Sequence, residues 1–359
     1  MTFPILTPSD MQVPENNTAK LALASTPSYA QALQALRIKH TRVREVMDEL
    51  NSLIYPGSQD SLLMVCGPTG AGKSALAQHM VKAEIERSAG EMEADAGLIP
   101  AVYIEARASG ADDFSWRLFY QSVLEQLDAA ELDMPKYHFG IDASTGMMVS
   151  PRSPKDRTLD GLRSAVERAL RHRKTRFLVI DEAAHIIHLT RRNRLEIQLD
   201  TLKSIANLAG VQIVLVGSYD LFRLMSLSGQ LARRIHVLHL ERYRQDNDTD
   251  IRAFRACVQK FQDAAAPIWG QSLMPYADAL HENTLGCIGT LSAVLTRAAR
   301  LTETKGSWSV EHLRTALLSE LQRQRILEEI LEGEAAINPG LTRTMPKPPK
   351  AGSQNHKVA

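Results

Sequence analysis

Cysteine, aromatic side chains and net charge are all scarce in this sequence. The 359 residues include only three cysteines, Cys66, Cys257 and Cys287, and they form no CxxC pair or Cys/His spacing that predicts a zinc site. An odd and sparse cysteine count fits a reducing compartment. Aromatic residues make up 5% of the chain, and Ala and Leu are frequent, which favours helices.

The balance of charge excludes one general mode of binding. Lys and Arg number 42, Asp and Glu number 41, and the formal net charge is +1. A chain so close to neutral has no overall field that attracts nucleic acid. Any such contact must therefore come from a local basic patch, or from a patch that oligomerisation repeats.

Long hydrophobic runs are also lacking. The longest apolar segments, such as 177–180 and 211–216, have the length of strands and are far too short to span a bilayer. The first residues, MTFPILTPSD, contain no basic region followed by an apolar stretch, so no signal peptide is expected. We expect a cytoplasmic protein without a membrane partner.

Short apolar segments alternate with amphipathic ones through the first two thirds of the chain. This alternation predicts an α/β fold with a parallel sheet that is covered by helices on both faces. The expected strands are Leu62–Cys66, Ala101–Ile104, Phe177–Ile180, Val211–Val216 and Ile235–Leu240. The expected helices of this part lie near 28–55, 74–90, 114–130, 158–173, 195–209 and 219–227.

Strand signals stop after Arg244, and the rest of the chain predicts a small all-helical lid domain. Its expected helices are 247–265, 272–283, 289–303 and 309–332. The expected division of the chain is a flexible arm at 1–27, an N-terminal helix with the α/β core at 28–244, the lid at 245–332, and a flexible tail rich in Pro and Lys at 333–359. Residues 131–157 are expected to form a long inserted loop.

A complete phosphate-binding motif follows the first expected strand. The segment Gly67-Pro68-Thr69-Gly70-Ala71-Gly72-Lys73-Ser74 matches GxxxxGK[ST], and it lies between a strand and a helix as that motif requires. Glycines let successive backbone N–H groups point at phosphates, and the helix N-terminus favours an anion. Lys73 can reach the β- and γ-phosphates of ATP, and Ser74 can bind Mg²⁺.

Two carboxylates end the strand Phe177–Ile180, where a Walker B motif is expected. Asp181 would complete the Mg²⁺ site, and Glu182 can polarise a water as a general base. A kinase does not need that glutamate, so its presence favours nucleotide hydrolysis over transfer to another substrate. The alternative is a strand that simply ends in two surface acids.

Two further groups are candidates for the catalytic machinery. Ser218, at the tip of the strand 211–216, can hold the attacking water, although it can also cap the next helix. Arg233 and Arg234, in the segment QLARRI, can reach across a subunit boundary to a neighbour's γ-phosphate, and we prefer Arg234. The alternative for this pair is an ordinary basic helix end.

The order of these segments resembles that of AAA+ ATPases. More narrowly, the chain is similar to transposition-regulator ATPases of the TniB/TnsC type, relatives of the phage Mu B protein. The resemblance covers roughly residues 28–320 and depends on Gly67–Ser74, Phe177–Glu182, Val214–Ser218, Gln230–Leu240 and Leu285–Leu291.

This resemblance implies a function that composition and periodicity do not. Members of the family bind ATP, assemble as rings or helical filaments on duplex DNA, and recruit a transposase; a separate protein selects the target. One departure concerns the lid, where many AAA+ proteins carry a sensor arginine close to a glycine. Here Gly289 is followed by Thr-Leu-Ser, and the nearest arginines are Arg297 and Arg300.

The resemblance also implies a basic DNA-binding surface. Phosphate contacts need only cationic or N–H donors at intervals. The candidates are Arg191, Arg192, Arg194 and Lys203 after the Walker B strand, and Arg152, Lys155 and Arg157 in the inserted loop. For each cluster the alternative is a solvated basic face.

Two other functions remain open from the sequence. One is an AAA+ ATPase of a secretion or membrane-assembly system that acts on a protein partner without binding DNA. The other is a nucleotide-controlled scaffold with little hydrolysis, although Asp181 and Glu182 argue against an inactive site. A metabolic kinase has the least support.

Overall fold

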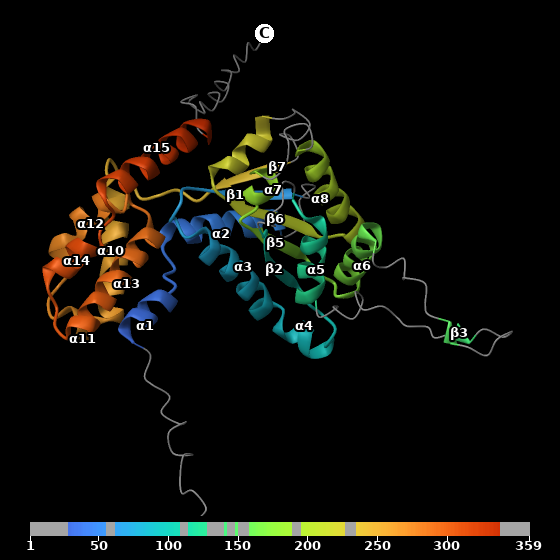
Figure 1. Cartoon of the computed structure of the whole chain (residues 1–359), viewed down its shortest axis with the longest axis horizontal. Coiled ribbons are helices and arrows are strands. Elements are labelled where there is room, and N and C mark those ends of the chain that lie inside the picture. The colour runs from blue at the N-terminus through green and yellow to red at the C-terminus, as the bar shows by residue number, and fades with distance from the viewer. Residues whose placement is uncertain are drawn as a thin grey trace, which may run out of the picture.

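An α/β core and a smaller lobe of helices, here called the lid, make up the molecule (Figure 1). The computed structural model describes residues 28–54, 62–107, 114–127, 140–141, 148–149, 158–188, 195–226 and 235–337. Within these residues the predicted class is confirmed, because a parallel sheet is followed along the chain by a helical lobe. No helix in this part of the chain combines the length and the apolar character needed to cross a membrane.

The core is built on one five-stranded sheet in which all neighbouring strands are parallel. Its order is β2-β5-β6-β1-β7, so β1 and β5, which precede the two nucleotide motifs, lie on either side of β6. The strands are β1 Leu62–Cys66, β2 Ala101–Glu105, β5 Phe177–Asp181, β6 Gln212–Gly217 and β7 Ile235–His239. A separate antiparallel pair joins β3 Gly140–Ile141 to β4 Met148–Val149.

The central strand β1 explains why the strands read as unbroken apolar runs. All five of its residues are buried. Because side chains alternate across a sheet, Leu62 and Met64 enter the hydrophobic cluster on one face, whereas Leu63 and Val65 enter the cluster on the other. Both faces of this sheet are therefore covered.

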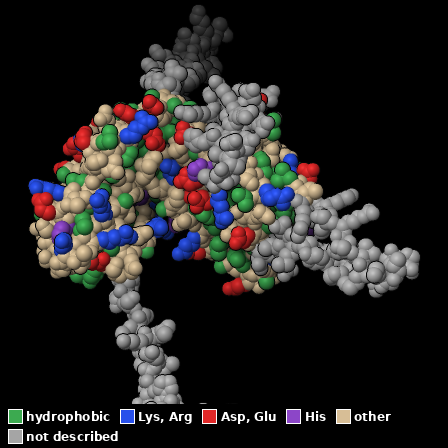
Figure 2. All heavy atoms as spheres, viewed as in Figure 1, with side chains coloured by type: hydrophobic (Ala, Val, Ile, Leu, Met, Phe, Trp, Pro, Cys, Tyr) green, Lys and Arg blue, Asp and Glu red, His purple; other side chains and the backbone are tan. Residues whose placement is uncertain are grey.

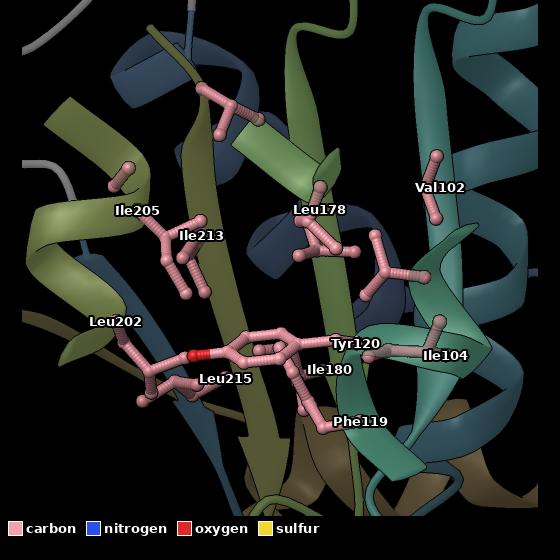
Figure 3. Close-up of a cluster of buried hydrophobic side chains, with 14 of the residues drawn as sticks. Val102, Ile104, Phe119, Tyr120, Leu178, Ile180, Leu202, Ile205, Ile213 and Leu215 are labelled. Atoms are coloured by element: carbon pink, nitrogen blue, oxygen red, sulfur yellow. The ribbon is translucent and has the colours of Figure 1, made fainter. Parts of the chain in front are cut away.

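The first face is covered by α5 Trp116–Gln126, α6 Leu159–His172 and α8 Leu195–Ala209 (Figure 1). Figure 3 shows how Phe119 and Tyr120 of α5 and Leu202 of α8 meet the strand residues Ile180 and Leu215. The second face is covered by α2 Thr41–Ile54 and α3 Lys73–Arg87. Short elements complete the core, namely α4 Ala89–Ala94, α7 Ala184–His188 and the 3₁₀ helix η5 Tyr219–Ser226.

The lid has a hydrophobic core of its own, around the fully buried Trp269, Phe254 and Phe261. Its elements are α10 Asp248–Ala264, α11 Ala266–Trp269, the 3₁₀ helix η6 Met274–Tyr276, α12 Ala277–Asn283, α13 Ile288–Lys305, α14 Val310–Ala316 and α15 Glu320–Ile337. The first helix of the described chain, α1 Tyr29–Ala35, also packs here, since Ala30 and Leu33 belong to this cluster.

Some helices differ from the expectation. The single helix expected at 28–55 is two helices, α1 and α2, and residues 36–40 cross from the lid to the core between them. The segment 309–332 is likewise divided into α14 and α15, and α15 continues to Ile337, beyond the expected start of the tail. The segment near 219–227 is a 3₁₀ helix. The arm at 1–27 and most of the loop 131–157 lie outside the described residues.

Candidate functional site

The carboxyl ends of three adjacent strands bring the predicted nucleotide residues together. Cys66 of β1 lies opposite Gly217 of β6 in the register, and Ile180 of β5 lies opposite Leu215. The P-loop and Ser218 directly follow β1 and β6, whereas Asp181 is the last residue of β5 and Glu182 follows it. In open parallel sheets, ligands bind at this edge of the sheet.

The P-loop connects β1 to α3 through a tight turn that needs its glycines. Gly70 and Gly72 have φ angles of 81° and 101°, which side-chain-bearing residues rarely adopt. Gly67 runs so close to the backbone of Leu240 that an added Cβ would lie 2.4 Å from its carbonyl oxygen. No side chain caps the first turn of α3, so this helix end is suited to a phosphate.

Lys73, the first residue of α3, is turned back along the loop. Its Nζ donates to the carbonyl oxygens of Gly67 at 3.0 Å and Pro68 at 2.9 Å. Burial lowers the pKa of Lys73, and the negative charges of Glu182, Glu329 and Asp181 oppose this effect. An ammonium in a buried loop surrounded by carboxylates is positioned to exchange these backbone contacts for phosphate oxygens.

Asp181 is 1% exposed and is held by two hydrogen bonds. The Tyr103 hydroxyl on the neighbouring strand β2 donates to Oδ2 at 2.9 Å, and the backbone N–H of Glu182 donates to Oδ1 at 2.9 Å. Burial and the Asp181 carboxylate raise the pKa of Tyr103, so this hydroxyl stays a donor. A carboxylate oxygen from Asp181 and a hydroxyl from Ser74 are ligands that Mg²⁺ prefers, and the ion would neutralise charge on the phosphates.

Glu182 has a backbone conformation that glutamate seldom takes. Its φ is 50°, in the left-handed region. The next residue is fixed to the sheet, since the N–H of Ala183 donates to the carbonyl of Val216 at 3.0 Å. Strain of this kind is retained where a surrounding structure holds it in place, and it often marks a functional position.

Ser218 lies where the sequence predicts a sensor residue. Its hydroxyl donates to Asp220 Oδ2 at 3.2 Å, and its carbonyl accepts from the N–H of Leu221 at 3.1 Å. The hydroxyl is thus engaged by a carboxylate rather than by a helix N–H. Its role toward the attacking water stays a prediction.

The lid touches the P-loop directly through the start of α13. The N–H of Thr290 donates to the carbonyl of Gly70 at 3.1 Å. A Cβ added to Gly289 would lie 2.7 Å from that same carbonyl, and one added to Gly70 would lie 2.0 Å from Thr290 Oγ1. Glycine on both sides of the contact is therefore required for this approach.

Neither Arg297 nor Arg300, the arginines nearest to the lid glycine in the sequence, lies at this contact. Arg300 points to α1, where its Nη2 donates to Gln34 Oε1 at 2.6 Å, and Arg297 is exposed. Ser292, three residues after Gly289, instead faces the cavity beside the P-loop. At the start of α13 the lid therefore meets the nucleotide site through backbone and hydroxyl groups.

A cavity of about 460 Å³ lies beside the P-loop, between the core and the lid. Figure 2 shows the surface hollowed between the two lobes, with basic side chains near the hollow. The cavity is lined by the crossing segment 36–40, the first turns of α3, and the start of α13. Its size and its place next to a phosphate site suit the base and ribose of a nucleotide.

This cavity does not follow from the sequence pattern, because that pattern predicts a helix through residues 36–40. Ile38 and His40 line it from that segment. His40 Nδ1 lies 2.9 Å from the Tyr243 hydroxyl, and burial, with the charges of Lys260 and Arg42, lowers the pKa of His40 to about 4. The imidazole is therefore uncharged near neutral pH. No spacing motif marks these residues, and only the crossing of the chain brings them to the site.

Of the expected arginine finger and DNA-binding residues, only Lys203 lies within the described residues. Six DNA-binding candidates and the finger pair lie outside the described residues, namely Arg152, Lys155, Arg157, Arg191, Arg192, Arg194, Arg233 and Arg234. Lys203, on α8, is described. Its Nζ lies 3.5 Å from Asp200 Oδ1 and its side chain is 12% exposed, which does not favour contact with a DNA phosphate.

Comparison with known proteins agrees with the fold. Residues 56–225 match the family described as "AAA domain". The chain is similar to the solved Aeropyrum pernix ORC2 protein in ADPNP–ADP complexes, with 16% identity, a TM-score of 0.54, and coverage of 79% of this chain and 69% of that one. It is also similar to the Aeropyrum pernix ORC1 protein in complex with DNA, with 15% identity, a TM-score of 0.52, and coverage of 81% and 70%. No curated protein sequence matches significantly.

The fold and the site together define a P-loop ATPase. Residues 56–225 match an AAA domain, and the strand ends bring together the residues of the predicted nucleotide site. A helical lid follows that domain along the chain and closes on the P-loop through Gly289 and Thr290.

The hydroxyl of Tyr103 gives a test of how Asp181 is oriented. We expect Tyr103→Phe to raise the Mg²⁺ concentration needed for half-maximal binding of an ATP analogue by about tenfold, because groups that orient a metal ligand usually contribute this much. Titration calorimetry at several Mg²⁺ concentrations measures the shift. Tyr120→Phe, which removes a buried hydroxyl on α5, is the control. Equal Mg²⁺ dependence in the two variants would contradict a positioning role for Tyr103.

Proposed function

We propose that this ATPase is a DNA-binding regulator of transposition of the TniB/TnsC type. The observation that carries the proposal is the lid contact, because the segment Leu285–Leu291, on which the resemblance partly depends, includes the two residues that meet the P-loop. One protein with a similar fold, Aeropyrum pernix ORC1, was solved in complex with DNA, so the fold is compatible with DNA binding.

In the proposed cycle, ATP with Mg²⁺ binds between neighbouring subunits and favours assembly on duplex DNA as a ring or helical filament. The residues that bind the phosphates and the ion are those of the P-loop, with Ser74 and Asp181 as ion ligands. The assembled surface recruits a transposase and a target-selection protein in the cytoplasm. Glu182 and a neighbour's Arg234 then promote hydrolysis, which releases the assembly.

DNA contact in this cycle is made by the basic clusters after the Walker B strand and in the loop 131–157. Lys203, the one DNA-binding candidate within the described residues, is ion-paired and mostly buried. The arginines of the two clusters are therefore better candidates than Lys203. A ring or filament repeats each cluster in every subunit, so a net charge of +1 per chain is no obstacle.

Negative-stain microscopy of the chain with duplex DNA tests the assembly. We expect rings or filaments on DNA with a non-hydrolysable ATP analogue and none with ADP. Glu182→Gln with ATP should give the same particles, and they should outlast those of the parent chain. Assemblies of Glu182→Gln that dissociate as fast as the parent's would contradict release by hydrolysis. Particles that form without DNA, or none at all, would favour an ATPase that acts on a protein partner.

A further inference from the structure

The last described helix, α15, contacts the P-loop, the residue after Ser218, and Arg242, which lies after β7. Thr69 Oγ1 of the P-loop donates to Glu329 Oε1 at 3.0 Å. Gly333 packs against Tyr219, the residue after Ser218. Glu334 accepts from Arg242 Nε at 2.8 Å. Figure 1 shows α15 running from the lid toward the core, where it contacts η5.

Glu329 places a negative charge beside a loop built to bind negative charge. Burial lowers the pKa of the Lys73 ammonium, and the charge of Glu329 opposes this effect together with the charges of Glu182 and Asp181. Lys73 and the N–H groups of the loop are also the groups that bind ATP phosphates. Glu329 and a bound nucleotide therefore compete for the same cationic surroundings and repel each other. A triphosphate carries more negative charge than a diphosphate and is repelled more.

The remaining contacts of α15 hold it against the turn before α13 and against Tyr219, so the helix can move as a unit. Ile330 is fully buried against Leu285 and Cys287, in the turn that precedes α13. Gly333 lies so close to the Tyr219 ring that an added Cβ would be 2.1 Å from Cγ. The helix thus fits the strand tip only because residue 333 has no side chain.

We propose that Glu329 discriminates between ATP and ADP at the P-loop, and that α15 shifts away from the loop when the triphosphate binds. The bound nucleotide then determines the position of α15. This inference rests on the ATPase site alone and does not depend on DNA binding or on transposition. It assigns Glu329 a role in nucleotide specificity, outside the hydrolytic groups Asp181 and Glu182.

The charge of Glu329 is tested by Glu329→Gln, with Glu332→Gln as its matched control. Glu332 lies on the same helix and is exposed, so both variants lose one charge from α15. We expect Glu329→Gln to tighten binding of a non-hydrolysable ATP analogue by about threefold to tenfold, to change ADP binding less, and to lose the difference at high salt. Titration calorimetry with Mg²⁺ measures both affinities. Equal ATP-to-ADP affinity ratios in the two variants would overturn the discrimination.

The movement of α15 is tested by Gly333→Ala, which changes no charge. Alanine favours a helix more than glycine does, so α15 itself is not weakened, but its contact with Tyr219 must open. Hydrogen–deuterium exchange over residues 320–337 should increase in the parent chain when the ATP analogue is added, and should be high in Gly333→Ala without nucleotide. Exchange in α15 that is the same with and without the analogue would overturn the proposed movement. Normal thermal unfolding of each variant confirms that it is folded.

Discussion

Glu182→Gln lowers the steady-state rate of ATP hydrolysis by about 10²–10⁴-fold and leaves nucleotide affinity nearly unchanged. Glutamine has the shape of glutamate but cannot accept a proton from water, so the variant removes the general base alone. The backbone N–H that holds Asp181 Oδ1 is retained, since it belongs to residue 182 whatever its side chain. Phosphate release and titration calorimetry measure the two quantities.

Glu105→Gln is the matched control for this variant. Glu105 ends the neighbouring strand β2, lies opposite Asp181 in the register, and is exposed. Glu105→Gln therefore removes the same charge near the same strand ends, and its rate of ATP hydrolysis should remain close to that of the parent chain. A rate for Glu182→Gln within threefold of the Glu105→Gln rate would exclude Glu182 as the general base.

Lys73→Ala weakens ATP binding by about 10²–10⁴-fold. The ammonium is the charged donor of the P-loop, and two charge-assisted hydrogen bonds to phosphate contribute roughly 3–6 kcal/mol. The variant removes the side chain that contacts the carbonyl oxygens of Gly67 and Pro68. The glycines of the P-loop are unchanged, so the loop can still form its turn. Titration calorimetry with ATP analogue and ADP is the measurement, and both nucleotides should lose affinity.

Lys305→Ala controls for the loss of one positive charge. Lys305 is the last residue of α13, is exposed, and lies at the far end of that helix from the P-loop contact. Its affinity for ATP should match the parent's. If Lys73→Ala bound ATP as tightly as Lys305→Ala, the phosphate site would have to lie elsewhere in the chain.

The strands and both nucleotide motifs were predictable from the sequence for a physical reason. Strands buried on both faces consist of continuous apolar residues, as in β1 and β5, and their ends are marked by a glycine turn or a charged pair. The predicted strand Leu62–Cys66 has the observed bounds, and the predicted strand Phe177–Ile180 is extended by Asp181. Local pattern determines these elements.

The cavity and the role of α15 were not predictable because they depend on contacts far apart in sequence. Apolar spacing continues through residues 36–40, so nothing local reveals the break that carries Ile38 and His40 to the P-loop. Similarly, Glu329 lies in an acidic helical segment that reads as a solvated face. Only the packing of α15 against the core brings its carboxylate to Thr69.

Nucleotide-dependent affinity for duplex DNA is the direct test of the proposed DNA-binding function. Fluorescence anisotropy at one fixed salt concentration should show binding at least about tenfold tighter with a non-hydrolysable ATP analogue than with ADP, and Lys73→Ala should not respond to the analogue. Equal affinity of the parent chain with the analogue, with ADP and without nucleotide, or no DNA binding under any of these conditions, would contradict the account.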